Sequence, residues 1–441
     1  MVASITQGSG SRRGAGLLAL LASPAVAVFL SHNIANAGNL FYNMLFSRWL
    51  GPETFGVLAT LLTLKLAILA LLNALQMAVS QQVSRGHNPV LTKALAVLDR
   101  RMIVGLSVLA LLLLPLAISG QLTSALGLPQ GAATALAILL LAVPITAPLC
   151  IWRGIAMGRQ RTGIIVASGQ LEMGVRLLGG ALAWVAGWGL TGVVAALVLS
   201  LVAGWLPVRR LGLAHGSRDA PTADHKAEMR FILKLALPFA ALQAAQVALM
   251  DGDVLAASVL LDQRDTGYVA VLGLLQRIQF FACFGLAAVL LPSVTAASMR
   301  GESGLREMRP IAFLFGATVL PLLGVMYLFP AKLLVIVAGP EFAGAAPALL
   351  ATGLAAAAFT GSYLMATILA AWSDRRGLVL FALAVPVQFG SYAILSKLWP
   401  DFELTHLMTT KAIVQTLLAL GLSSLVAQNI YTRFVSLKAG V

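Results

Sequence analysis

The chain has 441 residues, of which 59% are apolar and only 10% are charged. Soluble domains carry about 25% charged residues, so this composition excludes a soluble multidomain enzyme and a disordered chain. The net charge of +14 indicates basic loops in a membrane protein, where Lys and Arg gather on the cytoplasmic side. We therefore expect no nucleic-acid partner.

Cysteine and histidine usage is sparse. The two cysteines, Cys150 and Cys283, lie in apolar runs, and the five histidines do not follow metal-ligand spacing. This pattern predicts neither a disulfide framework nor a zinc or redox site. We expect no metal and no cofactor.

Apolar runs long enough to cross a bilayer, which takes about 20 residues, follow one another along the chain. They predict an all-α membrane protein with twelve transmembrane helices. In chain order these cover 18–46, 55–83, 101–121, 131–153, 163–186, 189–208, 230–259, 267–297, 310–336, 344–370, 377–398 and 404–432.

The basic residues predict the orientation of these helices. When the N-terminus is placed inside, most of the 30 Lys and Arg residues fall in the inside loops or at their rims. This bias predicts that both termini are cytoplasmic. Ser11–Arg13 and the following apolar run imitate an export signal, but the run continues to residue 46 and further helices follow. We interpret it as an ordinary first helix.

The longest inside loop lies at the midpoint of the chain. It predicts an N-terminal lobe over 1–208, a cytoplasmic linker over 209–229 and a C-terminal lobe over 230–441. A shift of 211 residues places Gly56 on Gly267 and Ala59 on Ala270. Six helices per half predict two lobes related by a pseudo-two-fold axis along the membrane normal, with a central cavity between them.

Polar side chains interrupt the apolar helices that open each half. The first two predicted helices carry His32, Asn36, Asn39 and Asn43, then Lys65, Asn73, Gln76 and Ser80. The seventh and eighth carry Gln243, Gln246, Asp251 and Asp253, then Gln276, Arg277 and Gln279. On the first helix the spacing i, i+4, i+7, i+11 puts all four residues on one face. Such stripes indicate either a polar chamber or hydrogen-bonded contacts between helices.

Charged residues inside the predicted helices need a physical reason, because burying charge in a bilayer is costly. Glu172 and Arg176 are four residues apart, which predicts a structural ion pair on one helix. Asp251 and Asp253 are candidates for ion coupling or for solvation at the outer rim. Lys411 either lines the chamber or neutralises a buried partner.

Lys65 and Arg277 have no Asp or Glu three or four residues away on their own helices. Each therefore either pairs with a carboxylate on another helix or faces a cavity that receives an anion. Arg is well suited to phosphate, which it binds with two parallel hydrogen bonds. Both residues are candidate substrate contacts.

The segment Asn43–Gly56, NMLFSRWLGPETFG, resembles the polysaccharide-transporter family, which contains the Wzx-type flippases for lipid-linked oligosaccharides. Its Arg48, Leu50, Gly51, Pro52, Phe55 and Gly56 match the family pattern R-x-L-G-P-x-x-[FY]-G. A weaker resemblance is DTGYVAV at Asp265–Val271. The family belongs to the multidrug/oligosaccharidyl-lipid/polysaccharide exporter (MOP) superfamily.

The resemblance implies two six-helix lobes around a cationic cavity that opens alternately to each side of a bacterial inner membrane. It implies an undecaprenyl-diphosphate-linked oligosaccharide as the substrate, for O-antigen, capsule or exopolysaccharide synthesis. Arg48 and Arg277 look like positions where the family places basic residues. Polysaccharide polymerase or export proteins are the implied partners, besides the lipid-linked substrate and membrane lipids.

Other functions remain open. A cation-coupled multidrug antiporter would need acidic residues deep in the cavity, and a lipid-linked peptidoglycan precursor flippase would work by a similar mechanism. A membrane glycosyltransferase or polymerase is the remote alternative. The sequence contains no nucleotide motif, Ser/His/Asp set or metal site, so we expect a transporter and not an enzyme.

Overall fold

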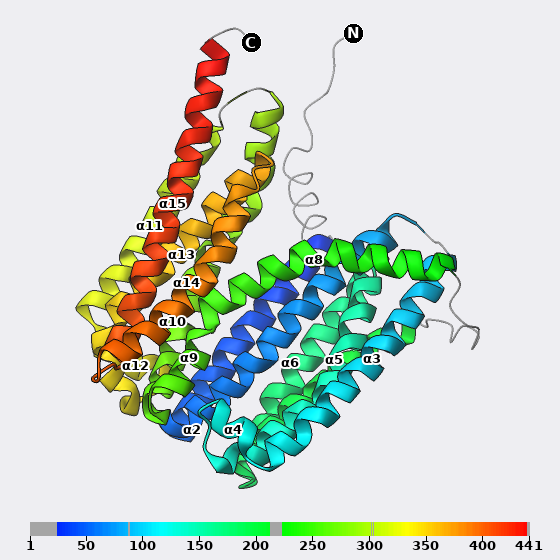
Figure 1. Cartoon of the computed structure of the whole chain (residues 1–441), viewed down its shortest axis with the longest axis vertical. Helices are drawn as coiled ribbons and strands as arrows, with labels where there is room; N and C mark the ends of the chain where they lie inside the picture. The colour runs from blue at the N-terminus through cyan, green and yellow to red at the C-terminus, as the bar shows by residue number, and fades with distance from the viewer. Residues whose placement is uncertain (1–23, 87–88, 212–222, 301, 303, 439–441) are drawn as a thin grey trace, which may run out of the picture. The chain divides into compact units, whose positions relative to one another are not determined.

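The chain is built from long α-helices (Figure 1). The computed structural model describes residues 24–438 except 87–88, 212–222, 301 and 303. Its α-helices are α2 (Pro24–Ser84), α3 (Pro89–Ile118), α4 (Gln121–Ala125), α5 (Ala133–Gly158), α6 (Thr162–Val185), α7 (Gly189–Val208), α8 (Ala223–Asp251), α9 (Asp253–Leu260), α10 (Gln263–Met299), α11 (Leu305–Leu328), α12 (Pro330–Ala338), α13 (Ala346–Ala371), α14 (Arg376–Leu398) and α15 (Leu404–Lys438). Short 3₁₀ helices are η1 (Gln130–Ala132), η2 (Arg209–Leu211) and η3 (Pro340–Ala345).

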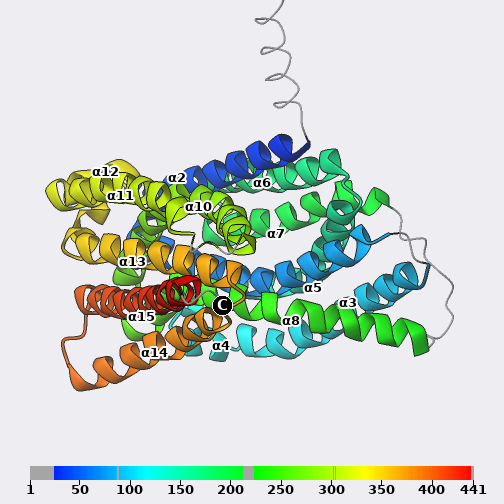
Figure 2. The ribbon, with the colours of Figure 1, turned by 90° about the horizontal axis from the view of Figure 1, so that it is seen from above.

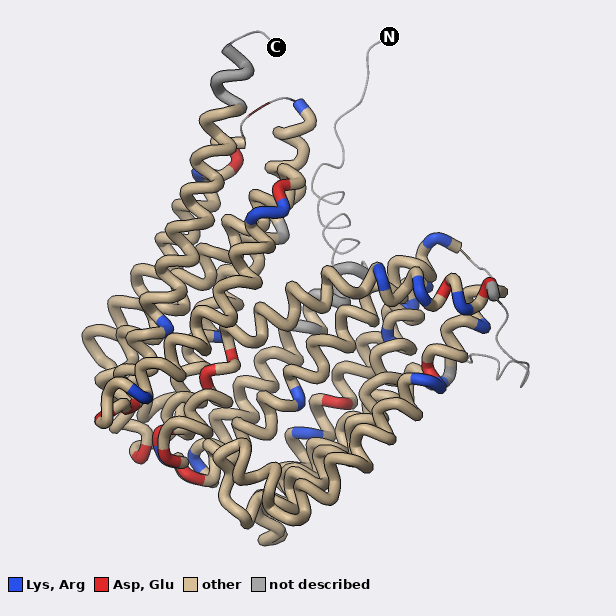
Figure 3. The backbone as a smooth tube through the Cα atoms, viewed as in Figure 1, with Lys and Arg blue, Asp and Glu red and all other residues tan. Residues whose placement is uncertain are grey.

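The described helices confirm a multi-pass, all-α membrane protein. Within the described part of the chain, 10 helices are long and apolar enough to cross a membrane. Charged residues gather toward helix ends and the connecting turns, while the middles of the helices are mostly uncharged (Figure 3). The count of twelve and the cytoplasmic termini stay predictions.

The first two predicted helices join into α2 at the Leu50-Gly51-Pro52 motif. Inside α2, Gly51 departs from helical dihedrals, with φ 67° and ψ 172°. A positive φ favours glycine because it has no Cβ, and Pro52 suits the start of the second segment because its fixed φ is helical. The sequence predicts a connecting turn between the helices over 18–46 and 55–83. In the structure that connection is a sharp kink at Gly51.

Two predicted helices are each divided in two, which corrects the sequence prediction. The helix expected over 230–259 breaks at Gly252 into α8 and α9, and the one expected over 310–336 breaks at Phe329 into α11 and α12. At Gly252 a side chain is excluded, because a Cβ there would lie 2.6 Å from Phe389 Cζ. The break at Phe329 has a local cause, because Pro330 begins α12 and a proline disfavours helical dihedrals at the residue before it.

The chain divides into two compact units. Unit 1 comprises residues up to 42, 72–114 and 138–237, and unit 2 comprises 43–71, 115–137 and the chain from 238 onward. The core of unit 1 includes Leu95, Leu149 and Leu201. The core of unit 2 is built around Phe280 and Phe359, whose ring centroids are 5.5 Å apart. The division into lobes over 1–208 and 230–441 stays a prediction.

Neighbouring long helices of unit 2 pack lengthwise, with α13 in contact with both α10 and α15 (Figure 2). In unit 1 the corresponding extensive pairing is between α6 and α7. Small residues at such crossings let backbones approach closely where lipid supplies no hydrophobic driving force.

The two glycines aligned by the 211-residue shift are in contact within unit 2. A Cβ on Gly56 would lie 2.8 Å from the Gly267 backbone nitrogen, and one on Gly267 would lie 1.9 Å from the Pro52 carbonyl oxygen. Only glycine allows this crossing of α2 and α10.

A second pair of contacts in unit 2 also follows the shift, which aligns Ser47 with Ser258 and Gly127 with Ala338. Ser47 Oγ donates to the Ala338 carbonyl at 3.4 Å. The aligned residues make the reciprocal contact: a Cβ on Gly127 would lie 1.6 Å from the Ser258 carbonyl oxygen. Aligned residues of the two halves therefore make corresponding contacts.

Candidate functional site

The charged residues predicted inside the helices, apart from Lys65, form three clusters, one in unit 1 and two in unit 2. The first cluster joins α5, α6 and α2, the second joins α8 and α10, and the third joins α9, α10 and α15. Each cluster contains at least one carboxylate paired with a basic side chain.

In unit 1, the Glu172 carboxylate binds two guanidinium groups. Arg176 Nη2 lies 2.5 Å from Glu172 Oε1, so the structure contains the ion pair that the i, i+4 spacing predicts. Arg153 Nη2 lies 2.9 Å from the other oxygen, Oε2. Arg176 also donates a hydrogen bond to Asn39 Oδ1 on α2. Two guanidinium groups on one carboxylate leave this cluster with a surplus positive charge.

The α5 residue Arg153 is held in this cluster by further contacts. Its Nε donates to Ser168 Oγ at 2.8 Å, and Ser168 donates in turn to the Gly204 carbonyl of α7 at 2.5 Å. A Cβ on Gly204 would lie 3.1 Å from both Arg153 Nη2 and Glu172 Cβ, so glycine leaves room for the ion pair. Arg153 was not among the predicted site residues, because it lies 19 residues from Glu172 on another helix and only the fold brings the two together.

In the second cluster, Arg277 pairs with Asp251. Arg277 Nη2 and Nε lie 2.6 and 2.7 Å from Asp251 Oδ1. The Asp251 side chain is 9% exposed and that of Arg277 is 27% exposed. The carboxylate partner on another helix, which the sequence left open for Arg277, is therefore present, and the Arg277 side chain stays partly exposed.

The third cluster is buried. Lys411 Nζ donates to Asp253 Oδ2 at 2.7 Å, to Gln276 Oε1 at 2.6 Å and to the Met250 carbonyl at 3.1 Å. The side chains of Lys411 and Asp253 are 0% and 1% exposed. Of the two roles open for Lys411, neutralising a buried partner is the one that the geometry supports. Asp253 is buried, so solvation at the outer rim does not explain it.

Buried amides extend the third cluster along α15. One turn beyond Lys411, Gln415 Nε2 donates to Gln388 Oε1 of α14 at 2.7 Å and to the Leu249 carbonyl at 3.3 Å. Buried polar groups of this kind are stabilised by their hydrogen bonds. Neither glutamine was predicted as a site residue: Gln388 stands alone in an apolar run, whereas the spacing of Gln415 from Lys411 was a signal that could have found it.

The remaining candidate residues lie at separate places on their helices. Lys65 and Asn43 are buried, while Asn36, Gln243 and Gln246 are half-buried. Gln76 Nε2 contacts Met157 Sδ at 3.1 Å. Arg48 lies just before the Gly51 kink and donates to the Ile336 carbonyl of α12. The His32 side chain lies outside the described residues. A cavity lined by all of these residues stays a prediction.

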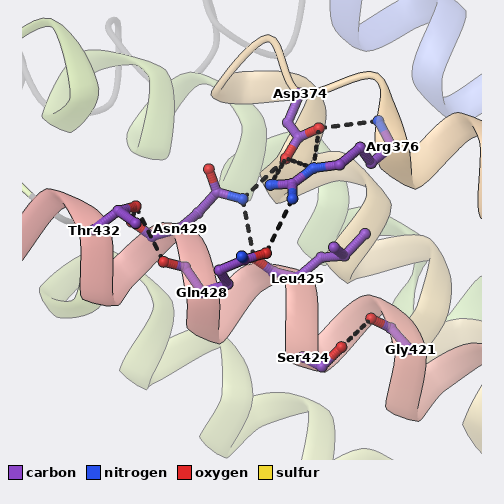
Figure 4. Close-up of polar contacts among 8 residues, drawn as sticks. All are labelled: Asp374, Arg376, Gly421, Ser424, Leu425, Gln428, Asn429 and Thr432. Carbon is purple, nitrogen blue, oxygen red and sulfur yellow. Dashed lines mark hydrogen bonds and ion pairs between the residues drawn. The ribbon is translucent and has the colours of Figure 1, made fainter.

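A further charged cluster fixes the turn between α13 and α14 to α15 (Figure 4). Arg376 Nη2 and Asn429 Nδ2 donate to Asp374 Oδ2 at 2.8 and 2.9 Å, and Arg376 Nη1 donates to Gln428 Oε1 at 2.9 Å. The hydrogen bonds from Arg376 hold the pKa of the Asp374 carboxyl well below its usual range. The sequence analysis did not identify this cluster.

The described residues contain no group of three or more His, Cys, Asp or Glu side chains that could hold a metal ion. Cys150 and Cys283 are free thiols and buried.

Comparison with known proteins finds no matching family model and no matching curated protein. Solved structures do match. A multidrug resistance MATE family transporter of the MOP superfamily, in an inward-facing conformation, aligns with a TM-score of 0.72 and 17% identity over 91% of this chain and 96% of that one. A structure described as an outward-facing conformation of a MATE family transporter aligns with a TM-score of 0.64 and 15% identity over 93% and 96%.

A third match is a MOP superfamily transporter from Pyrococcus furiosus, with a TM-score of 0.64 and 15% identity over 93% of this chain and 96% of that one. It is described by a reverse polarity of its binding pocket that suggests a different function. The likeness covers nearly the full length of each protein. The chain therefore has the fold of the MATE-type transporters of the MOP superfamily.

Proposed function

We propose that this chain is an alternating-access transporter that moves an anionic, diphosphate-linked oligosaccharide lipid across the membrane. The diphosphate and sugars cross through a polar chamber between two lobes, while the lipid tail stays in the bilayer. The fold supports a transporter, since the matching structures include inward-facing and outward-facing MATE family transporters. The charges support an anionic substrate, and the resemblance of Asn43–Gly56 to the polysaccharide-transporter family supports a lipid-linked oligosaccharide.

The observation that carries the proposal is the positive surplus at Glu172. Arg153 and Arg176 both bind this carboxylate, so its charge is more than neutralised. Guanidinium groups bind phosphate oxygens with short, charge-assisted hydrogen bonds. Such a cluster favours an anion over a cation.

The acidic residues argue against the antiporter alternative. A cationic substrate needs a carboxylate whose charge is not already neutralised. Each of Glu172, Asp251 and Asp253 has a basic side chain within 2.9 Å. A MOP superfamily transporter from Pyrococcus furiosus is itself described by a pocket of reverse polarity. Substrate charge can therefore differ among proteins of this fold.

Binding of small charged probes to the purified protein tests whether the site prefers an anion or a cation. Farnesyl diphosphate represents the polyprenyl diphosphate, and tetraphenylphosphonium represents an organic cation. We expect Arg176→Gln to weaken farnesyl diphosphate binding by about tenfold or more, because a charge-assisted hydrogen bond contributes about 1.5–3 kcal/mol. Glu172→Gln should strengthen it, because it removes negative charge. Arg300→Ala, at an exposed ion pair with Glu302, is the matched control.

A cationic substrate would give the reverse order. If tetraphenylphosphonium binds more tightly than farnesyl diphosphate and Glu172→Gln abolishes that binding, the antiporter is the better account. If neither Arg176→Gln nor Glu172→Gln changes diphosphate binding, the unit 1 cluster has no part in recognising the substrate.

A further inference from the structure

The ammonium of Lys411 is surrounded by the kinds of oxygen that bind a monovalent metal ion. Carboxylate, amide and backbone carbonyl oxygens are the ligands of hard cations in proteins. Here Asp253 Oδ2, Gln276 Oε1 and the Met250 carbonyl lie 2.7, 2.6 and 3.1 Å from Nζ. These oxygens come from three elements: Met250 lies in α8, Asp253 in α9 and Gln276 in α10. The ammonium holds them together.

The cluster also has coordinating capacity beyond the three contacts. Asp253 Oδ1 has no hydrogen-bond partner among the described residues, although its side chain is 1% exposed. A charge buried in a low-dielectric interior is stable only with a partner of opposite sign. Lys411 supplies that partner from α15, so the carboxylate oxygens stay in place without a bound ion.

The charges nearby sum to zero. Lys411 neutralises Asp253, and Arg277 neutralises Asp251, two residues along the chain. A free cation added to this neutral set would meet the ammonium at close range. Like charges at such distances repel strongly in the protein interior.

We infer that Lys411 is a tethered cation that occupies a monovalent-cation site formed by Asp253, Gln276 and the Met250 carbonyl. The site is closed to Na⁺ in the natural protein, and removal of the Lys411 side chain opens it. Unit 2 therefore keeps its α9–α10–α15 contacts at any sodium concentration. This inference concerns the ion and not the transported molecule, so it does not depend on the proposed substrate.

Radioactive sodium binding to the purified, detergent-solubilised full-length chain tests the inference directly. The wild-type protein should bind no Na⁺ saturably, and its melting temperature should be the same in sodium chloride and choline chloride. Lys411→Ala should bind Na⁺ in equimolar amount and melt at a higher temperature in sodium chloride than in choline chloride. Lys411→Ala combined with Asp253→Asn, which lacks the carboxylate, should lose both effects.

Two results would overturn the inference. One is a folded Lys411→Ala protein that binds no sodium. The other is saturable sodium binding by the wild-type protein that Asp253→Asn abolishes, because the natural cluster would then accept a free ion beside the lysine. Saturable sodium binding by the wild-type protein would overturn the inference even if Lys411→Ala does not fold.

Discussion

Replacing Gly267 with alanine tests the crossing of α2 and α10 within unit 2. The new Cβ would lie 1.9 Å from the Pro52 carbonyl oxygen, 2.6 Å from the Pro52 carbonyl carbon and 2.9 Å from its Cα. All three are backbone atoms, so no side-chain rotation relieves the overlap. An ordinary carbon–oxygen contact is about 3.3 Å, so α2 and α10 must separate by roughly 1.4 Å at this point.

Forcing extra atoms into a packed contact costs about 1–3 kcal/mol. The Gly267→Ala protein should therefore melt several degrees below the wild type, as measured by thermal unfolding in detergent. Gly273→Ala on the same helix is the matched control, because its Cβ would meet no atom within 4 Å. Alanine is the better helix former by about 1 kcal/mol, so the control should melt at or above the wild-type temperature.

Comparing the melting temperatures of the two variants separates the effect of steric overlap at Gly267 from the effect of alanine's higher helix propensity. If Gly267→Ala melted as high as Gly273→Ala, the close approach of Gly267 to Pro52 would not exist in the folded protein. The alignment of Gly56 with Gly267 as contacting residues of two repeats would then lose its structural support.

Three further predictions concern the charged groups and the orientation. Lys411→Met should cost about 3–5 kcal/mol of stability, because it leaves the Asp253 carboxylate buried without a partner. Adding Asp253→Asn should recover most of that loss. An equal loss of stability in the double variant would contradict the pairing of Lys411 with Asp253. The lowered pKa of Asp374 means that its carboxylate stabilises the fold fully above about pH 4, and that this contribution disappears as the pH falls through the lowered value. The stability difference between wild type and Asp374→Asn should thus be constant from neutral pH to about pH 5 and shrink only at lower pH, as unfolding midpoints across pH would show; a difference that shrinks near neutral pH would contradict the Arg376 contacts. Single cysteines at Ser119 and Arg161 should label with a membrane-impermeant maleimide from outside and inside respectively, and the opposite pattern would reverse the predicted orientation.

Helix positions could be predicted from the sequence because apolar runs of bilayer length are a strong signal. The helix expected over 189–208 is α7 to the residue. The break at Phe329 has a local signal in the sequence, because Pro330 begins α12 and a proline disfavours helical dihedrals at the residue before it. The break at Gly252 is harder to predict, because its close neighbour Phe389 lies 137 positions along the chain.

The same distinction applies to the candidate site. The Glu172–Arg176 pair could be predicted because both residues lie on one helix face, four positions apart. The partners of Arg277 and Lys411 are 26 and 158 residues away in sequence, and no local pattern points to them. The roles of Arg277 and Lys411 could therefore be assigned only from the three-dimensional structure, which shows their carboxylate partners.

Lys65 shows a different limit. Its burial on α2 fits the expectation that a deep basic residue on this helix faces away from lipid. Whether it contacts a substrate depends on a chamber between two lobes, and that chamber stays a prediction. The Arg153–Glu172–Arg176 cluster is the better starting point, because its geometry lies within one compact unit.

The most direct test of the transport proposal is to delete the gene and analyse the lipids of the strain that lost it. The account predicts that a complete oligosaccharide repeat unit linked to a polyprenyl diphosphate accumulates on the cytoplasmic side. The wild-type gene should restore export, and the Arg176→Gln variant should restore less of it at equal protein level. Normal lipid-linked intermediates together with intact surface polysaccharide would contradict the account.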